Sequence, residues 1–209
     1  MSITVIFFLG LIVALIGVIP PGLLNMTAAR ISLKEGAARG IMFSTGVSIV
    51  VFIQTYIAAI FARYLSNRPD IVEILQRVAF VLFVLITIYF LILASKQKQA
   101  KTETEIRSKH GRLLHGMLLS ALNVFPIPYQ AYMTITLASF GWMDFERTNI
   151  ITYVTGASMG TFVMLYFYIF FFDKIKDKKF TSQKSMNYSI GIITGIVALI
   201  TFINILREL

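Results

Sequence analysis

The stretch Gly17-Val18-Ile19-Pro20-Pro21-Gly22-Leu23-Leu24-Asn25 lies in residues 1–29, a run that contains no charged side chain. Proline removes a backbone donor and clashes with the preceding helical turn, and glycine tolerates dihedral angles that other residues avoid. An α-helix that enters this stretch is therefore expected to break at Pro20, Pro21 and Gly22.

A helix break at membrane depth needs partners for the freed backbone groups, because hydrocarbon offers none. Such a break persists only where it is buried in protein or lines a polar cavity. Asn25 directly follows the break, and its amide suits two roles. It can cap the freed backbone groups, or it can contact a solute, and the sequence leaves both roles open.

The composition is that of an integral membrane protein, since 57% of the 209 residues are hydrophobic and only 14% are charged. Six runs between charged residues can each supply the roughly 20 apolar residues that a membrane-spanning helix needs. These runs are residues 1–29, 40–62, 78–95, 113–143, 148–172 and 185–206. They lack the alternation of barrel strands. The sequence therefore predicts an all-α polytopic membrane protein with six transmembrane helices.

The distribution of basic residues predicts the orientation in the membrane. We interpret residues 1–29 as a retained first span, because no Lys or Arg precedes their apolar core. If the N-terminus lies outside, the inner loops hold 14 of the 19 Lys and Arg residues and the outer side holds 5. Because cytoplasmic loops carry the basic excess, we expect a multi-pass protein of the cytoplasmic (inner) membrane with both termini outside. The net charge of +9 then needs no nucleic-acid partner.

Several chemistries lack the residues that they need. The chain has no cysteine, which excludes disulfides, thiolate metal sites and thiol redox chemistry. Its histidines are His110 and His115, and the spans carry no constellation of His, Asp and Glu with catalytic or metal-binding spacing. No phosphate-binding G-x-x-x-x-G-K-[ST] loop is present. We therefore expect no enzyme, no catalytic or metal site, no cofactor and no ATP-driven pump.

The polar stretch of residues 96–112 divides the chain into two halves of three spans. An odd number of spans per half inserts the second half upside down relative to the first, as in inverted-repeat transporters. We expect a first three-helix repeat at residues 1–95, a basic cytoplasmic linker at 96–112 and a second three-helix repeat at 113–209.

The second half repeats the break of the first. Its first run, residues 113–143, is longer than one span needs and contains Asn123-Val124-Phe125-Pro126-Ile127-Pro128-Tyr129-Gln130. The first and fourth helices are thus both predicted to be broken, and transporter sites form where such helices meet near the midplane. Gln54 belongs with them, because a polar amide inside the second span faces another helix or a wet path. The expected substrate pathway comprises Pro20, Pro21, Gly22, Asn25, Gln54, Asn123, Pro126, Pro128 and Gln130.

Spaced glycines predict close contacts between helices. Small residues four positions apart share a helix face and let another backbone approach. Packing roles are therefore expected at Gly36, Gly40, Gly46, Gly156 and Gly160. Such faces also leave open the association of several copies of the chain into a homo-oligomer.

Over nearly its whole length the chain resembles the LysE/RhtB (lysine exporter) family of amino-acid efflux proteins. Members typically show Pro-Gly-Pro-Asn after the first span, spaced glycines in the second, and Asn-Pro opening the second half. The counterparts here are Pro20-Pro21-Gly22 with Asn25, then Gly36, Gly40 and Gly46, then Gly116 and Asn123 followed by Pro126 and Pro128.

The chain departs from the family pattern at both breaks. Leu23 and Leu24 separate Gly22 from the asparagine, and Val124-Phe125 stands where members often have Pro-Lys. A fixed cation for a carboxylate is therefore missing in the second half. The helix N-termini at the breaks can supply partial positive charge instead.

The resemblance implies a secondary transporter that exports a small zwitterionic solute, an amino acid or a derivative, through the lipid bilayer. The alternative is a membrane structural or binding protein in which the breaks and small residues serve assembly only. No acidic residue lies in the central part of a span, so Glu73 is the candidate for proton coupling, although Arg77 favours its charged form. The sequence identifies neither the solute nor the coupling ion.

Overall fold

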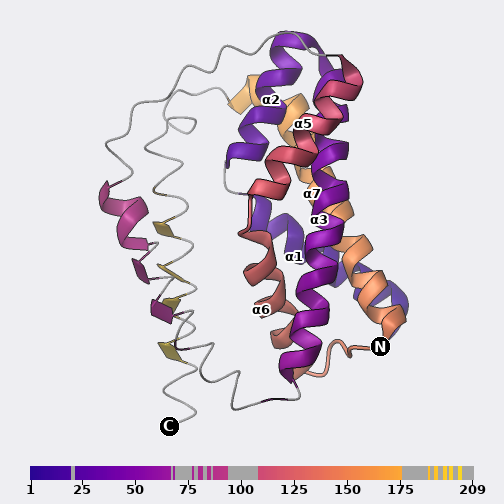
Figure 1. Ribbon diagram of the computed structural model, residues 1–209, viewed down its shortest axis with the longest axis vertical. Helices are drawn as coiled ribbons and strands as arrows, with labels where there is room; N and C mark the ends of the chain where they lie inside the picture. Colours follow the sequence, from indigo (N-terminus) through magenta and orange to yellow (C-terminus); the bar gives the residue numbers. More distant parts are fainter. Residues whose placement is uncertain are drawn as a thin grey trace. The chain divides into compact units, whose positions relative to one another are not determined.

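The structure is a computed structural model in which every described element is helical (Figure 1). It describes residues 1–19, 22–66 and 108–175, with residues 68, 77, 80–81, 84–85, 87–93, 188, 191–192, 195–196, 198–199 and 202–203. The elements are α1 (Ile3–Val18), α2 (Leu23–Glu35), α3 (Ala37–Ser66), the π-helical η1 (Tyr89–Leu93), α5 (Lys109–Leu122), α6 (Pro126–Ser139) and α7 (Arg147–Ile175). The prediction of an all-α protein is confirmed for this part of the chain.

Two helices are long and apolar enough to cross a membrane: α3, and α7 over Arg147–Phe171. The pair α1 and α2 passes the same test as one bent span, with 81° between the two helices. The described residues therefore contain two candidate membrane spans, or three if the bent pair counts as one. Seven of the 18 residues of the third predicted span and 13 of the 22 residues of the sixth lie outside the described residues, so the total of six stays a prediction.

The chain forms two compact units, and each takes residues from both halves of the sequence. The first unit is Met1–Tyr64 with Thr104–Asp173, and the second is Leu65–Glu103 with Lys174–Leu209. These units are defined by contacts, whereas the predicted boundaries at 1–95, 96–112 and 113–209 follow the order of spans. The repeat division stays a prediction. The site described below lies within the first unit.

The helices of the first unit break at the proline stretches in both halves. α1 ends at Val18, and Gly22 is the N-cap of α2. Pro20 and Pro21 lie outside the described residues. α5 ends at Leu122, and α6 begins at Pro126, where a missing N–H costs no helical hydrogen bond. Figure 1 shows α5 and α6 following one another along the length of α3.

Glycines bring α1 and α7 into backbone contact. A Cβ added at Gly10 of α1 would collide with the carbonyl oxygen of Tyr153, and one added at Gly156 of α7 would collide with that of Phe7. Gly160 lies one turn further along α7 and meets the carbonyl oxygen of Leu11. Because backbone atoms cannot rotate away, these positions have no room for a side chain.

A second glycine crossing joins α3 to α5. A Cβ at Gly46 would collide with the carbonyl oxygen of Leu113, and one at Gly116 would collide with that of Phe43. The two crossings match residue by residue. Each contacting residue of α5 has a residue number 106 higher than its equivalent in α1. Each contacting residue of α7 has a residue number 110 higher than its equivalent in α3.

The remaining two glycines of the predicted packing set have different surroundings. At Gly40 a Cβ would lie 3.0 Å from the Cβ of Ser32 and 3.2 Å from Cδ1 of Ile169. Gly36 is no packing residue, since nothing lies within 4 Å of a Cβ added there. This expectation is wrong because Gly36 has a φ of 94° and closes the turn between α2 and α3, a conformation that L side chains rarely adopt.

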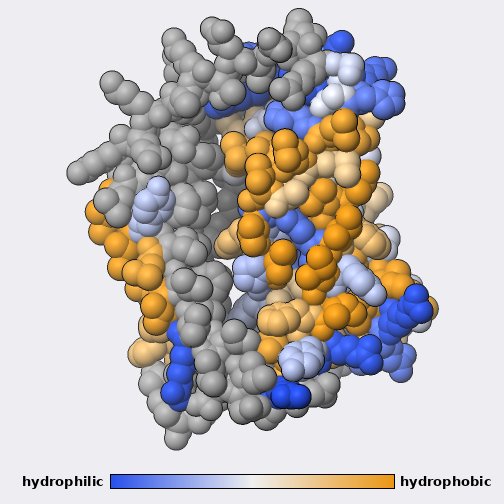
Figure 2. Space-filling model, viewed as in Figure 1, coloured by the Kyte–Doolittle hydropathy of each residue, from blue (hydrophilic) through white to orange (hydrophobic). Residues whose placement is uncertain are grey.

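The first unit is filled by two apolar clusters and is apolar on much of its outside. Figure 2 shows hydrophobic residues over much of its visible face and hydrophilic residues gathered toward its ends. On α3, Ile53 and Ile57 are each about half exposed, as suits a face in contact with lipid. One cluster is Ile6, Val13, Ala59, Leu137, Met143, Ile150, Tyr153 and Val154. The other is Ala28, Ile31, Phe43, Val47, Val51, Leu165 and Ile169.

Candidate functional site

A cavity of about 80 Å³ lies where residues of the two helix breaks come together. At about 10–15 Å³ for one water-sized probe, it holds several water molecules or one small solute. Its wall consists of Ala14, Gly17, Val18, Leu24, Asn25, Val47, Val51, Asn123, Phe125, Pro126, Tyr129, Gln130, Thr161 and Leu165. None of these side chains carries a formal charge at neutral pH, so the wall is apolar with a few neutral polar groups.

The structure brings together part of the predicted pathway. Asn25, Asn123, Pro126 and Gln130 line the cavity. Gly22, Pro128 and Gln54 are not among the lining residues. Pro20, Pro21 and the predicted coupling residue Glu73 lie outside the described residues.

Asn25 caps the end of α1 and also lines the cavity. Its side chain is 3% exposed, and its Nδ2 donates a hydrogen bond of 2.7 Å to the carbonyl oxygen of Val18. The next carbonyl, that of Ile19, accepts a hydrogen bond of 2.7 Å from the hydroxyl of Tyr168 in α7. The cap role and a position at the cavity wall are therefore compatible in one residue.

Gln54 caps the end of α5 in the same way. Its Nε2 donates to the carbonyl oxygens of Ser120, at 3.1 Å, and Asn123, at 2.9 Å. The side chain thus satisfies backbone groups that the break in the fourth predicted span sets free. Its Oε1 and the hydroxyl of Thr55 are buried without a hydrogen-bond partner among the described residues.

One tyrosine lines the cavity and a second bonds a residue of its wall, and sequence reasoning missed both roles. The hydroxyl of Tyr129 donates to the carbonyl oxygen of Val13 at 2.8 Å, and its ring lies so close to Gly17 that an added Cβ would be 2.7 Å from Cε1. The hydroxyl of Tyr153 donates to Oε1 of Gln130 at 2.8 Å. The signal in the sequence was a tyrosine directly beside Gln130, inside the broken helix.

The cavity also receives the ends of four helices. Leu24 and Asn25 belong to the first turn of α2, and Pro126 begins α6. Neither helix has a side-chain cap at its N-terminus. At α2 the free N–H groups of the first turn carry partial positive charge to the cavity. At α6 Pro126 and Pro128 have no N–H and that of Ile127 donates to the carbonyl oxygen of Val124, so only the positive end of the helix dipole contributes there. Val18 ends α1 and Asn123 follows α5, and helix ends of this polarity carry partial negative charge.

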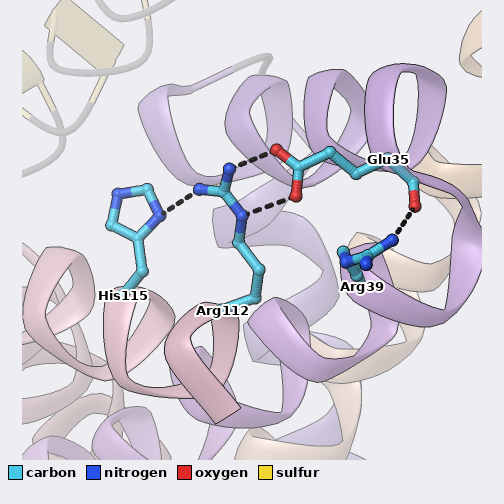
Figure 3. A network of polar contacts seen from close by, with 4 residues as sticks. All are labelled: Glu35, Arg39, Arg112 and His115. Atoms are coloured by element: carbon cyan, nitrogen blue, oxygen red, sulfur yellow. Dashed lines mark hydrogen bonds and ion pairs between the residues drawn. The ribbon is translucent and has the colours of Figure 1, made fainter. Parts of the chain in front are cut away.

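A buried ion pair joins the end of α2 to the start of α5 (Figure 3). The Nε of Arg112 donates to Oε2 of Glu35 at 2.8 Å, and its second guanidinium nitrogen bonds Oε1. Each side chain is only 1% exposed. The third guanidinium nitrogen lies 3.1 Å from Nδ1 of His115, and Arg39 donates to the backbone carbonyl of Glu35 at 2.8 Å.

Sequence reasoning placed Arg112 in the basic linker of residues 96–112. In the structure Arg112 lies inside α5, which begins at Lys109, and it is fully buried. Glu35 and Arg112 are 77 positions apart, and no local pattern connects them. Within the described residues, no group of three or more His, Asp and Glu side chains is placed to hold a metal ion.

The geometry defines a class: a helical membrane protein whose broken helices meet at a small cavity with a largely apolar wall and a few neutral polar groups. A family model, the LysE type translocator, matches residues 15–204. The chain therefore belongs to the LysE type translocator family, which confirms the resemblance seen in the sequence and makes it a multi-pass membrane transport protein. No curated protein and no solved structure matches it.

Proposed function

We propose that the chain is a secondary transporter that exports a small zwitterionic solute, an amino acid or a derivative, and that the cavity is its binding site. The observation that carries this proposal is the charge pattern of the wall. It offers neutral amides, two uncapped helix N-termini and two helix C-terminal ends, with no formal charge.

The charges of a zwitterion match the partial charges of this wall, because the solute carries one charge of each sign and no net charge. Its carboxylate suits the N–H groups at the start of α2 and the positive end of the α6 dipole, and its ammonium group suits carbonyl oxygens and amide oxygens. A solute with net charge would bring an uncompensated charge into a small, largely apolar space, which is costly. Asn25, Asn123 and Gln130 supply the polar contacts that fix its orientation.

The matched glycine crossings support an inverted repeat of three plus three helices. In such a repeat α1, α2 and α3 correspond to α5, α6 and α7, and the α1–α7 crossing corresponds to the α5–α3 crossing. Ser158 of α7 gives further support, because its hydroxyl donates at 2.9 Å to the carbonyl oxygen of Ser48. Ser48 and Ser158 are related by the same offset of 110, and equivalent residues meet at an axis of pseudo-symmetry.

The proposed orientation places both termini outside the inner membrane. In it, the end of α2 and the start of α5 face the cytoplasm, and both carry exposed basic residues such as Lys34 and Lys109. Reporter fusions at the two termini test this orientation. A cytoplasmic C-terminus would contradict it.

Asn123→Leu is the sharpest test of the binding site. No hydrogen bond of the Asn123 side chain to a described residue is present, so the change should spare the fold while removing a polar group from the cavity. We expect export of amino acids from loaded cells to fall by about tenfold, a loss of about 1.4 kcal/mol in binding, with membrane abundance unchanged.

Thr155→Leu is the matched control, because Thr155 lies on the exposed face of α7 and, among the described residues, its hydroxyl bonds only its own helix. Its export should equal that of the unaltered chain. Normal export by Asn123→Leu would refute the binding site. A failure to export any member of an amino-acid panel would refute the proposed function and favour the structural alternative.

A further inference from the structure

The buried pair of Glu35 and Arg112 engages all three guanidinium nitrogens of the arginine (Figure 3). Two nitrogens of Arg112 bond the carboxylate, and the third contacts His115. Because arginine has no acceptor, Nδ1 of His115 must be the acceptor in that contact and carries no proton. The pair is therefore held in one geometry from three directions, and it connects a helix of the first half to a helix of the second.

Closing this end of the unit with a buried ion pair costs free energy of desolvation. Removing two charges from water costs free energy that their attraction seldom exceeds, so an apolar pair of similar volume is often at least as stabilising. At the corresponding position of the other half, an apolar side chain stands in place of the charged one. The offset of 106 relates Arg112 to Ile6, and both are 0% exposed. Ile6 packs in an apolar cluster with Leu137 of α6.

The fold therefore closes one end with apolar side chains and the opposite end with charges. Packing alone does not require the charges, because the equivalent crossing does without them. Breaking a buried ion pair is costly unless both partners regain water or other partners. An ion pair in this position keeps the two helices together while water is excluded, and it separates when water or another charge reaches it.

The location of the pair connects it to the cavity. Asn25 and Glu35 are ten residues apart on α2, which is about 15 Å at 1.5 Å per residue. Arg112 and Asn123 are eleven residues apart along α5, or about 16 Å. The two helices that reach the cavity at one end are thus tied to each other at their far ends.

We propose that Glu35 and Arg112 are a latch that closes the cytoplasmic end of the solute pathway, and that α2 and α5 part there to admit the solute. This inference rests on the proposed export function and on its orientation in the membrane. In the latched state the bidentate pair excludes water between the helices. In the open state both charges are hydrated, and the cavity is reached from the cytoplasm.

The absence of cysteine from the chain makes a direct test possible. A single cysteine at Thr161, which lines the cavity and is 4% exposed, reports access to it. A membrane-impermeant maleimide is applied to inside-out vesicles and, separately, to cells with a permeable outer envelope. The rate of labelling then measures opening toward each membrane face without requiring that the solute be known.

Glu35→Gln keeps the shape of the side chain and removes its charge. We expect it to speed labelling from the cytoplasmic face by about tenfold, which corresponds to about 1.4 kcal/mol in the opening equilibrium. Exchanging the charges, with Glu35→Arg and Arg112→Glu together, should return the rate toward its original value. Glu146→Gln removes an exposed carboxylate outside the pair and should leave the rate unchanged.

Arg112→Lys provides a second variant if Glu35→Gln accumulates poorly. It keeps the charge but loses the two-pronged fork, so it should speed labelling by a smaller factor than Glu35→Gln. Unchanged cytoplasmic labelling in both variants would overturn the latch, as would an equal rise in Glu146→Gln. A rise confined to the opposite membrane face would overturn its cytoplasmic assignment. Failure of export with normal labelling responses would refute the proposed function and leave the latch standing.

Discussion

The crossing of α3 and α5 yields a prediction whose size follows from the coordinates. In Gly116→Ala, the new Cβ would collide with the carbonyl oxygen of Phe43 and lie 3.0 Å from its carbonyl carbon and 3.2 Å from the backbone nitrogen of Val47. All three neighbours are backbone atoms. The strain can therefore be relieved only by moving one helix away from the other.

The net effect combines two opposing contributions. Overpacking in a close-packed interior costs about 1–3 kcal/mol. Replacing a helical glycine by alanine returns about 0.5–1 kcal/mol through helix propensity. We expect a net loss of about 1–2 kcal/mol, which lowers Tm by about 2–8 °C for a chain of this size.

Thermal unfolding of the purified protein in detergent measures this loss. Gly195→Ala is the matched control, because its Cβ would lie 3.4 Å from Cγ2 of Thr87, an ordinary contact distance. Gly10→Ala, at the equivalent crossing, should lose as much as Gly116→Ala. An unchanged or higher Tm for Gly116→Ala would refute the close backbone approach on which the matched crossings depend.

Three further outcomes follow from contacts around the cavity and at one loop. Tyr129→Phe removes the tyrosine donor to the carbonyl oxygen of Val13 and should lower stability by about 0.5–1.5 kcal/mol, measured by the same unfolding assay. Gln54→Leu removes hydrogen bonds to two carbonyl oxygens at the end of α5, of which only that of Ser120 keeps another donor, the N–H of Asn123, so it should cost at least as much and reduce membrane abundance in an immunoblot. The backbone N–H of Glu146 lowers the pKa of Asp144, with a further contribution from a neighbouring asparagine. Stability from this carboxylate is present above the unfolded pKa of about 3.9 and lost as pH falls through the lower folded value, so Asp144→Asn should flatten the acid limb of a plot of Tm against pH.

Local chemistry explains which features could be predicted from the sequence. Proline and glycine act on the few residues around them, so both helix breaks fall at the predicted stretches. Polar groups at a break must find partners nearby, which is why residue types alone were enough to make Asn25 and Asn123 candidates. Local rules also mislead, as Gly36 shows, because a four-residue spacing cannot tell a packing glycine from one that closes a turn.

Contacts between distant segments could not be read from the sequence. Glu35 and Arg112 each looked like one more charge at a basic membrane edge, and only the fold makes them a buried pair. Gln54 was recognised as a polar group in need of a partner, but its partners are backbone carbonyl oxygens 66 and 69 positions away. Every residue has a backbone carbonyl oxygen, so residue types do not reveal which of these oxygens accept a side-chain hydrogen bond.

The contact of α1 with α7 has a consequence for how the protein is made. Gly10 and Gly156 are separated by 146 residues, so at about 5–20 residues per second α1 enters the membrane about 7–30 s before its partner is synthesised. Throughout that interval the carbonyl oxygen of Val13 also lacks its hydrogen bond from the hydroxyl of Tyr129. The first helix must therefore persist in the bilayer as a half-satisfied intermediate, and its final packing is settled only after the second half has been inserted.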